Sequence, residues 1–423
     1  MIGRVLQAGR ALRHRNFRLF FAGQSLSLIG TWMTKLATTW LVYRLTGSSL
    51  LVGIVAFAGL FPTFALAPFA GVWMDRVDRR SLLVWTQVAA AVQSLVMAAL
   101  TLAGVVTIGE IIVLAVLQGA INAFDMPTRQ TFLIQMVEDR GDLSNAIALN
   151  SSMVNAARLV GPALAGVLIG VIGEGGVFLI DGISYVAVIA SLVMMRLSSR
   201  ETPGPAASMV EQIREGWQYV STFRPVRSIL LLAALLCFVG YPYTVVLPVF
   251  ASEVFGGGGP TLGLLTGAAG VGALISALSL AARTTVVGLT HNLQAAATML
   301  GIGLVLFGLS HWLWLSLLLM AVVGFGIMQT LAVANTIIQT LVSEDKRGRV
   351  MSYYTMALFG ATPFGSLLIG AMANRVGAPI TIVAAGLFCL AASIWFTAEL
   401  PKVRAVMRPI YREMGLLPVR DID

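Results

Sequence analysis

The sequence predicts an all-α membrane protein with twelve transmembrane helices in two six-helix bundles. Hydrophobic residues make up 57% of the 423 positions, or roughly 241, and twelve spans of ~20 residues would use ~240. Charged residues make up only 11%, less than half of the ~25% that is usual in soluble domains. Long apolar runs alternate with short charged segments, which excludes a soluble multidomain enzyme and a disordered chain.

Twelve apolar runs are long enough to cross a bilayer. Runs of this length favour helices, because a helix satisfies its own backbone hydrogen bonds in lipid, and the alternating pattern of β-barrel strands is absent. In chain order, the expected spans cover residues 17–43, 47–73, 81–106, 109–135, 145–170, 175–195, 228–252, 261–282, 291–309, 312–341, 350–373 and 378–399.

The basic residues predict the orientation of these spans. Twenty-three of the 28 Lys and Arg residues lie in the terminal segments and in the loops after even-numbered spans, whereas only Arg44 and Arg375 lie in loops on the other side. By the positive-inside rule, both termini are expected in the cytoplasm of a multi-pass protein of the plasma (inner) membrane. Basic faces against anionic lipid headgroups account for the net charge of +9 without nucleic acid as a partner.

The longest polar stretch divides the chain into two halves. We expect an N-terminal bundle over 1–195, a cytoplasmic linker over 196–227, a C-terminal bundle over 228–399 and a cytoplasmic tail over 400–423. The loop sequence Met-Val-Glu-Asp-Arg-Gly after span 4 resembles Leu-Val-Ser-Glu-Asp-Lys-Arg-Gly after span 10. Matched features in two halves are typical of transporters whose binding site lies between repeats, and chance similarity of apolar helices is the alternative.

The sequence indicates no metal site and no cofactor. Cys237 and Cys389 lie inside apolar runs, and His14, His291 and His311 are scattered without ligand spacing. No phosphate-binding loop of the ATPase type occurs, so an ion gradient is the expected energy source. The basic N-terminus precedes an apolar run that is too long for a cleaved signal peptide, so we expect a retained first span.

A loop signature follows the second span, where residues 71–80 read Gly-Val-Trp-Met-Asp-Arg-Val-Asp-Arg-Arg. Here the chain resembles the major facilitator superfamily, whose signature is Gly-x-x-x-Asp-Arg-x-Gly-Arg-Arg/Lys, with Asp78 in place of the second glycine. The resemblance implies a cytoplasmic gate that holds the outward-facing state, in which Asp125 of span 4 contacts Arg79; arginines that serve topology alone are the alternative. The predicted gate residues are Gly71, Asp75, Arg76, Arg79, Arg80, Asp125 and Arg129.

Span 5 carries a second signature, because residues 155–166 read Asn-Ala-Ala-Arg-Leu-Val-Gly-Pro-Ala-Leu-Ala-Gly. It resembles the Gly-Pro-rich signature of the superfamily's antiporters, and we predict a helix bend at Gly161, Pro162 and Gly166. Segments 30–33, 40–48, 124–130 and 145–150 are similar to the exporter branch that includes the enterobactin exporter and the macrolide efflux pumps. The resemblance implies a drug:proton antiporter.

Charged residues inside spans are functional candidates, because each is costly in lipid unless it is paired. Arg158 lies ~20 Å from the cytoplasmic end of span 5 and Asp181 ~9 Å from the outer end of span 6, so their depths coincide in a ~30 Å core. We predict an Arg158–Asp181 pair that either staples the helices or couples to protons. Asp125 lies on one helix face with Arg129 and is either a structural latch or a second proton-coupling group.

The expected cavity combines one cation with an apolar and aromatic wall. By the superfamily resemblance Lys35 in span 1 lines the cavity and would attract an acidic substrate, unless its side chain reaches to the outer surface. Aromatic and Met-rich walls accept varied amphipathic ligands. The predicted cavity residues are Trp32, Lys35, Trp40, Tyr241, Tyr243, Phe325 and Gln329.

These features predict a secondary active transporter, not an enzyme. It would export amphipathic small molecules, either drug-like compounds or secondary metabolites, by proton antiport with alternating access. A dedicated siderophore exporter with Lys35 as counter-ion, a lipid or lysolipid flippase and a membrane sensor are the alternatives. The expected partners are a small-molecule substrate, protons and membrane lipids, and we expect a monomer.

Overall fold

The computed structural model describes residues 9–74, 77–137, 139–196, 209–283 and 285–416. The predicted gate residues Asp75 and Arg76 and residues 197–208 of the expected linker lie outside these ranges. All regular secondary structure within them is helical.

The first part of the chain forms five long helices within the described ranges. The elements are η1 (Arg10–Arg13), α2 (Arg15–Thr46), α3 (Ser49–Met74), α4 (Arg79–Leu102), α5 (Ile108–Phe132), η2 (Leu133–Met136), η3 (Arg140–Asp142) and α6 (Leu143–Met194). α2 ends at Gly47, whose left-handed backbone (φ +61°) suits glycine. α5 begins with a capping box, in which Thr107 and Glu110 satisfy each other's backbone N–H groups.

The helix α6 is 52 residues long and contains a sharp break at Gly173. The φ of Gly173 is +70°, a region that is costly for residues with a Cβ atom, and its ψ is 176°. The chain therefore changes direction there and continues as a second helical segment. This break falls between the expected fifth and sixth spans.

The second part begins with the short helices α7 (Met209–Thr222) and α8 (Arg224–Leu235). The expected seventh span is not one regular helix, because π-type segments η4 (Leu236–Gly240) and η6 (Phe250–Val254) flank η5 (Tyr241–Val245) and α9 (Leu247–Val249). Pro242 and Pro248 lack the N–H that a continuous helix needs. The remaining elements are α10 (Gly259–Ala281), α11 (Leu289–Leu309), α12 (Leu313–Leu341), α13 (Glu344–Val376) and α14 (Ala378–Glu413).

Ten helices in the described ranges are long and apolar enough to cross a membrane, fewer than the twelve expected spans. α6 counts once among the ten although Gly173 divides it, and the more polar α2 is not one of them. The helix α14 continues through residue 400 to Glu413, so the first part of the expected cytoplasmic tail is helical.

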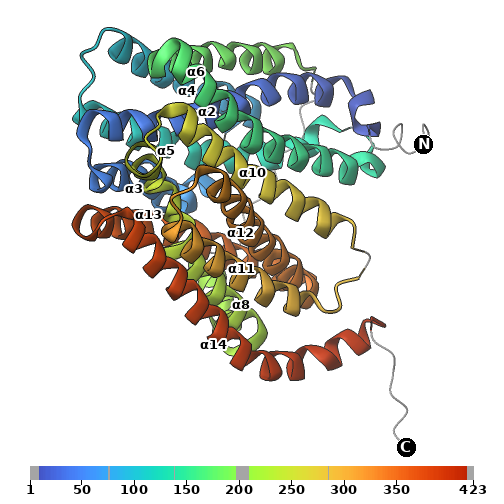
Figure 1. Ribbon diagram of the computed structural model, residues 1–423. Coiled ribbons are helices and arrows are strands. Elements are labelled where there is room, and N and C mark those ends of the chain that lie inside the picture. Colours follow the sequence, from blue (N-terminus) through green and yellow to red (C-terminus); the bar gives the residue numbers. More distant parts are fainter. Residues whose placement is uncertain (1–8, 75–76, 138, 197–208, 284, 417–423) are drawn as a thin grey trace, which may run out of the picture. The chain divides into compact units, whose positions relative to one another are not determined.

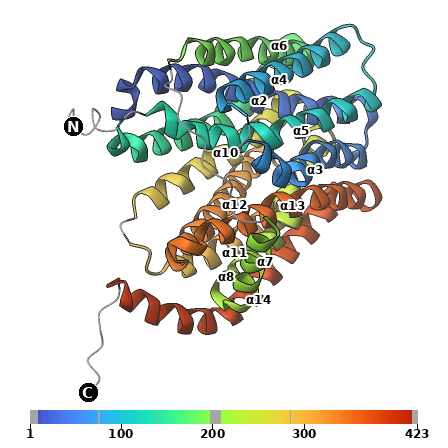
Figure 2. The ribbon, with the colours of Figure 1, turned by 180° about the vertical axis from the view of Figure 1, so that it is seen from behind.

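The contacts group the chain into two units. One consists of Met1–Gly204 and Leu247–Gly267, and the other of Pro205–Val246 and Ala268–Asp423. The domain boundaries expected from the sequence place residues 247–267 in the second half instead. In the first unit α6 packs along α2 and α4, and these three helices lie side by side in Figures 1 and 2. In the second unit α11 packs against both α12 and α14.

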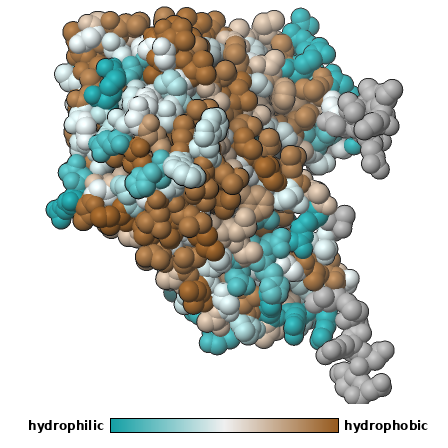
Figure 3. Space-filling model, in the orientation of Figure 1, coloured by the Kyte–Doolittle hydropathy of each residue, from teal (hydrophilic) through white to brown (hydrophobic). Residues whose placement is uncertain are grey.

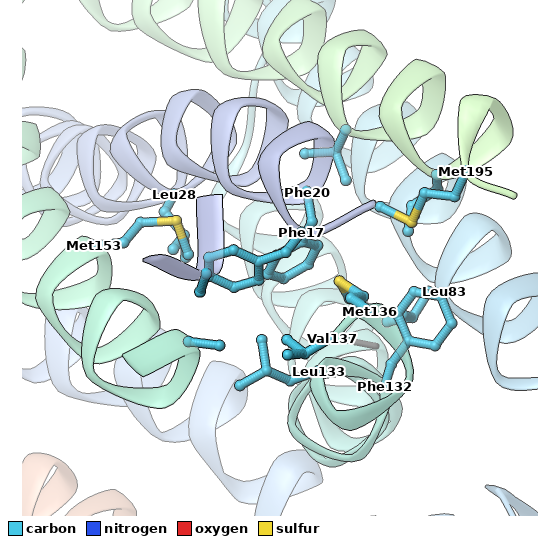
Figure 4. Close-up of a cluster of buried hydrophobic side chains, with 14 of the residues drawn as sticks. Phe17, Phe20, Leu28, Leu83, Phe132, Leu133, Met136, Val137, Met153 and Met195 are labelled. Atoms are coloured by element: carbon cyan, nitrogen blue, oxygen red, sulfur yellow. The ribbon is translucent and has the colours of Figure 1, made fainter. Parts of the chain in front are cut away.

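The core of the first unit is a cluster of buried side chains from α2, α4, α5 and α6 and from η1 and η2. Figure 4 shows Phe17 and Phe20 of α2 facing Leu83 of α4, Phe132 of α5 and Met153 of α6. Large apolar side chains also cover the surface, and Figure 3 shows wide hydrophobic areas on it. An exposed apolar surface of this extent suits helices that face lipid.

Candidate functional site

The side chain of Trp32 lies under two cations. The Lys35 Nζ atom lies 4.9 Å from the centroid of the Trp32 ring, and the Arg158 Cζ atom lies 5.2 Å from it. Lys35 is one turn after Trp32 on α2, whereas Arg158 comes from α6. The close approach depends on Gly161, because a Cβ atom there would lie 2.6 Å from the Trp32 Cβ atom. One turn separates Gly161 from Arg158, so the same face of α6 carries both.

Lys35 forms no ion pair with any acidic side chain in the described part of the chain. Its side chain is exposed. Asp181 of α6 contacts α2 at Gly30. With 100° per residue, Lys35 is rotated by ~140° around the axis of α2 from Gly30. Lys35 thus leaves α2 on another side from the one that faces Asp181.

Asp181 is buried between three helical segments, at 2% exposure. Its Oδ2 atom accepts hydrogen bonds from Thr34 of α2 (2.8 Å) and Ser94 of α4 (3.0 Å). Its Oδ1 atom has no hydrogen-bond partner among the described residues. The sequence analysis did not predict these two hydroxyl partners. The signal that could have indicated them is a hydroxyl side chain within an otherwise apolar span. The predicted Arg158–Asp181 pair stays a prediction.

Asp125 is buried on α5 and is held by a charged partner and two neutral ones. The Arg129 Nη2 atom lies 3.1 Å from Oδ2, one turn along the same helix. From α4, the Gln87 Nε2 atom donates to Oδ1 at 2.6 Å and the Thr86 hydroxyl at 3.2 Å. The predicted contact of Asp125 with Arg79, the first residue of α4, stays a prediction.

The loop signature forms local contacts at the start of α4. Asp78 caps this helix, because its carboxylate accepts from the Ser81 backbone N–H (2.8 Å) and hydroxyl (2.7 Å). Burial opposes ionisation of Asp78, but the Ser81 hydrogen bonds and the Arg80 charge outweigh it, so its pKa lies below the ordinary value. Arg80 donates to the carbonyls of Leu192 (2.8 Å) and Val193 (2.6 Å) at the C-terminal end of α6. Gly71 lies in α3.

Two further ion contacts join elements of the first unit. The Tyr43 hydroxyl donates to Glu253 Oε1 at 2.5 Å. Next to it, Arg44 pairs with Glu174 through Nε at 2.7 Å and Nη2 at 3.2 Å. The predicted cavity residue Trp40 is buried near Tyr43, with ring centroids 6.4 Å apart.

Residues 161–166 of α6 have helical dihedral angles, and a separate break in this helix lies at Gly173. Gly166 serves a close approach: a Cβ atom there would lie 2.7 Å from the Gly263 Cα atom of α10. The bend at Gly161, Pro162 and Gly166 stays a prediction.

The other predicted cavity residues belong to the second unit. Tyr241 and the buried Tyr243 lie in η5, and Phe325 lies on α12. Gln329 of α12 is buried, and its Oε1 atom accepts from Ser276 of α10 at 2.7 Å. Trp32, Lys35 and Trp40 lie in the first unit.

These groups carry charge or bind charged and polar partners. Within the described ranges, no group of three His, Cys, Asp or Glu side chains could hold a metal ion. The polar clusters are buried carboxylates with hydroxyl, amide or guanidinium partners, together with cations over an indole ring. This chemistry suits recognition and charge movement within a membrane.

The model of the transmembrane secretion effector family matches residues 8–414. The chain is 27% identical to the staphyloferrin A transporter of Staphylococcus aureus, over 85% of this chain and 90% of that protein. It is 28% identical to the multidrug efflux pump Tap of Mycolicibacterium fortuitum, over 92% and 94%. It is 22% identical to macrolide efflux protein A of Streptococcus pyogenes, over 86% and 92%.

A solved structure of similar fold is that of a bacterial homologue of the human lysosomal transporter Spinster, in an inward-facing and occupied conformation. The TM-score is 0.71 at 15% sequence identity, over 90% of this chain and 95% of that chain. These findings confirm the resemblance to efflux proteins and the helical membrane fold. The protein belongs to the transmembrane secretion effector family of the major facilitator superfamily and is a membrane transporter, not an enzyme.

Proposed function

We propose that the protein is a secondary active transporter that exports amphipathic small molecules by proton antiport. The observation that carries this proposal is the similarity to a multidrug efflux pump along 92% of this chain and 94% of the pump. The similarity over nearly the whole length supports the same class of transport, whereas the substrate depends on the residues of the site and not on the fold.

Transport by alternating access requires two bundles that move against each other. The proposed topology has twelve spans, with both termini in the cytoplasm of the plasma membrane. Treating α2 and the two segments of α6 as separate spans brings the ten counted helices to twelve. With 32 residues, α2 is ~48 Å long and exceeds the ~30 Å hydrocarbon core.

Asp181 is the proposed proton carrier. Its hydrogen-bond donors Thr34 and Ser94 are neutral, and its Oδ1 atom has no partner in the described part of the chain. Asp125 instead contacts the guanidinium of Arg129, so a change of its charge would break an ion pair. A carboxyl group that can change its charge without losing a charged partner is better suited to take up and release a proton.

Reconstitution in liposomes with an imposed pH gradient tests the function. We expect accumulation of amphipathic probes, ethidium and erythromycin, that stops when a protonophore collapses the gradient. One charge moving across 100 mV supplies ~2.3 kcal/mol, enough for a ~50-fold concentration ratio. Accumulation that continues without any ion gradient would contradict secondary transport.

Asp181→Asn tests the proton step. We expect at least a tenfold lower rate of gradient-driven transport, because an amide cannot carry the proton, with exchange of probe at equal pH retained. Asp139→Asn, which alters an exposed loop carboxyl, is the matched control and should leave both rates unchanged. If Asp181→Asn lost driven transport and exchange equally, Asp181 would have a structural role and would not be the proton carrier.

A dedicated siderophore exporter is the second candidate, favoured by the exposed Lys35 without an ion pair in the described ranges and by the relative named a staphyloferrin A transporter. A strain that lacks the gene separates the two. Broad drug sensitivity supports multidrug export, whereas a growth defect under iron limitation alone supports siderophore export.

A further inference from the structure

We propose that the hydroxyl group of Thr34 relays protons between water and the buried carboxyl group of Asp181. The inference rests on the proposed proton antiport and names the residue through which its carrier exchanges protons. A carrier needs such a connection, because Asp181 is only 2% exposed.

The two hydrogen-bond partners of Asp181 differ in burial. The hydroxyl of Thr34, which donates to Asp181 Oδ2 at 2.8 Å, belongs to a half-buried side chain. The hydroxyl of Ser94 donates to the same oxygen at 3.0 Å and also lies 2.9 Å from the carbonyl of Phe178, and Ser94 is fully buried. Of these two hydroxyls, the one on Thr34 can therefore contact both the carboxylate and a water molecule.

Thr34 lies between the part of α2 that contacts Asp181, at Gly30, and the side that carries Lys35. With 100° per residue, Thr34 is rotated by ~40° around the helix axis from Gly30, and Lys35 by ~140° in the same direction. The exposed Lys35 lies ~16 Å before the end of α2 at Thr46. Charged side chains within spans face the bundle interior or a water-filled space, so Lys35 marks a side of α2 that water reaches.

The other titratable group near Asp181 does not provide this connection. Tyr185, one turn further along α6, interacts electrostatically with Asp181 and also with Asp125 and Arg129. Its hydroxyl lies 3.4 Å from Thr31 Oγ1, and the residue is 5% exposed. Tyr185 is thus nearly as buried as the acid, and it forms no hydrogen bond with Asp181 in the described part of the chain.

The relay is a linked transfer of two protons. The O–H bond of Thr34 breaks as its proton forms an O–H bond on Asp181 Oδ2, and a protonated water molecule gives a proton to the Thr34 oxygen. The hydroxyl is thereby restored, Asp181 becomes neutral and water remains; the reverse steps release the proton, and no group is oxidised or reduced. A hydroxyl can act in this way because it both donates and accepts hydrogen bonds.

Rapid acidification of the purified full-length protein in uncharged detergent, followed by infrared spectroscopy, tests the relay without any gradient. The carboxylic acid C=O band that Asp181→Asn lacks reports the protonation of Asp181. Thr34→Val keeps the shape of the side chain but removes the hydroxyl. We expect it to slow the appearance of this band roughly tenfold or more and to leave the final amplitude at low pH unchanged.

Three variants separate a relay from a structural role. Thr34→Ser keeps the hydroxyl and should keep the wild-type rate. Ser94→Ala removes the other donor to Asp181 Oδ2 but not the connection to water, so it should slow the band far less than Thr34→Val. Thr39→Val, the same substitution on the same helix, is the matched control and should behave as wild type, because Thr39 donates to the Lys35 carbonyl at 2.9 Å.

Equal rates in the wild type and Thr34→Val would overturn the relay, as would a Thr34→Ser rate as low as that of Thr34→Val. If Asp181→Asn loses no band, Asp181 takes up no proton, and both the relay and the proposed carrier are wrong. If the rates follow the expectation but a pH gradient drives no probe into liposomes, the proposed function fails and the relay stands.

Discussion

At the scale of single residues, Asp142 ties the N-terminal segment to the start of α6. Its buried carboxylate lies 2.7 Å from Arg13 Nη2, 3.0 Å from His14 Nε2 and 3.8 Å from Arg10 Nε. Nearby, Asn145 Oδ1 accepts from the backbone N–H of Ala11 at 2.9 Å. Burial opposes ionisation of Asp142, but the His14 hydrogen bond and the arginine charges outweigh it, so its pKa is lowered.

This lowered pKa predicts a pH-dependent contribution to stability. A carboxylate whose native pKa lies below its unfolded value of ~3.9 stabilises the native state above that pH, and the contribution disappears as the pH falls through the native pKa. Asp142→Asn should therefore lower the melting temperature between pH 5 and pH 8, and by less below about pH 4. The measurement is thermal unfolding in detergent across this range.

Asp139→Asn serves as the comparison, because Asp139 contacts the same Arg13 from an exposed position. Exposed ion pairs contribute ~0–1 kcal/mol, so its effect should be small at every pH. A difference between wild type and Asp142→Asn that grows as the pH falls below 4 would contradict the assignment.

At the scale of elements, glycine pairs allow α6 and α10 to approach through their backbones. A Cβ atom on Gly263 would lie 2.5 Å from the Gly166 Cα atom, and one on Gly166 would lie 2.7 Å from the Gly263 Cα atom. Such contacts are typical of helix pairs in membranes, where small residues provide close packing. Backbone atoms cannot rotate away as a flexible side chain can, so the helices would have to separate.

We expect Gly263→Ala to lower the free energy of unfolding by about 1–3 kcal/mol, the usual cost of overpacking, despite the ~1 kcal/mol that alanine gains over glycine in a helix. Denaturant unfolding in detergent measures the change.

Gly267→Ala is the matched control on the same helix. A Cβ atom there would meet the Ala163 Cβ atom at 3.5 Å, an ordinary contact, so this variant should be neutral or slightly more stable. Equal effects of the two substitutions would show that the close approach does not limit stability.

At the scale of the whole molecule, the distribution of charge predicts which ends of the spans lie in the cytoplasm. The loops after residues 170 and 252, which hold Gly173 and Gly256, are expected outside, whereas Arg80 and Arg347 are expected inside. We expect cysteines introduced at 173 and 256 to react with an impermeant maleimide in intact cells, and cysteines at 80 and 347 to react only after permeabilisation. Labelling of position 80 in intact cells would overturn the orientation.

The sequence by itself determined the class of the protein, its helical character and most helix positions, because long apolar runs and loop charges are local properties that lipid acts on directly. It also placed the break near Gly173 and the charged residues within spans. Only the tertiary structure decided the partners of those charges: Thr34 and Ser94 for Asp181, Gln87 for Asp125, and Trp32 for Lys35 and Arg158. Hydroxyls and rings occur throughout apolar spans, so their pairing depends on which helix faces meet, and that is set by close contacts such as Gly161 against Trp32.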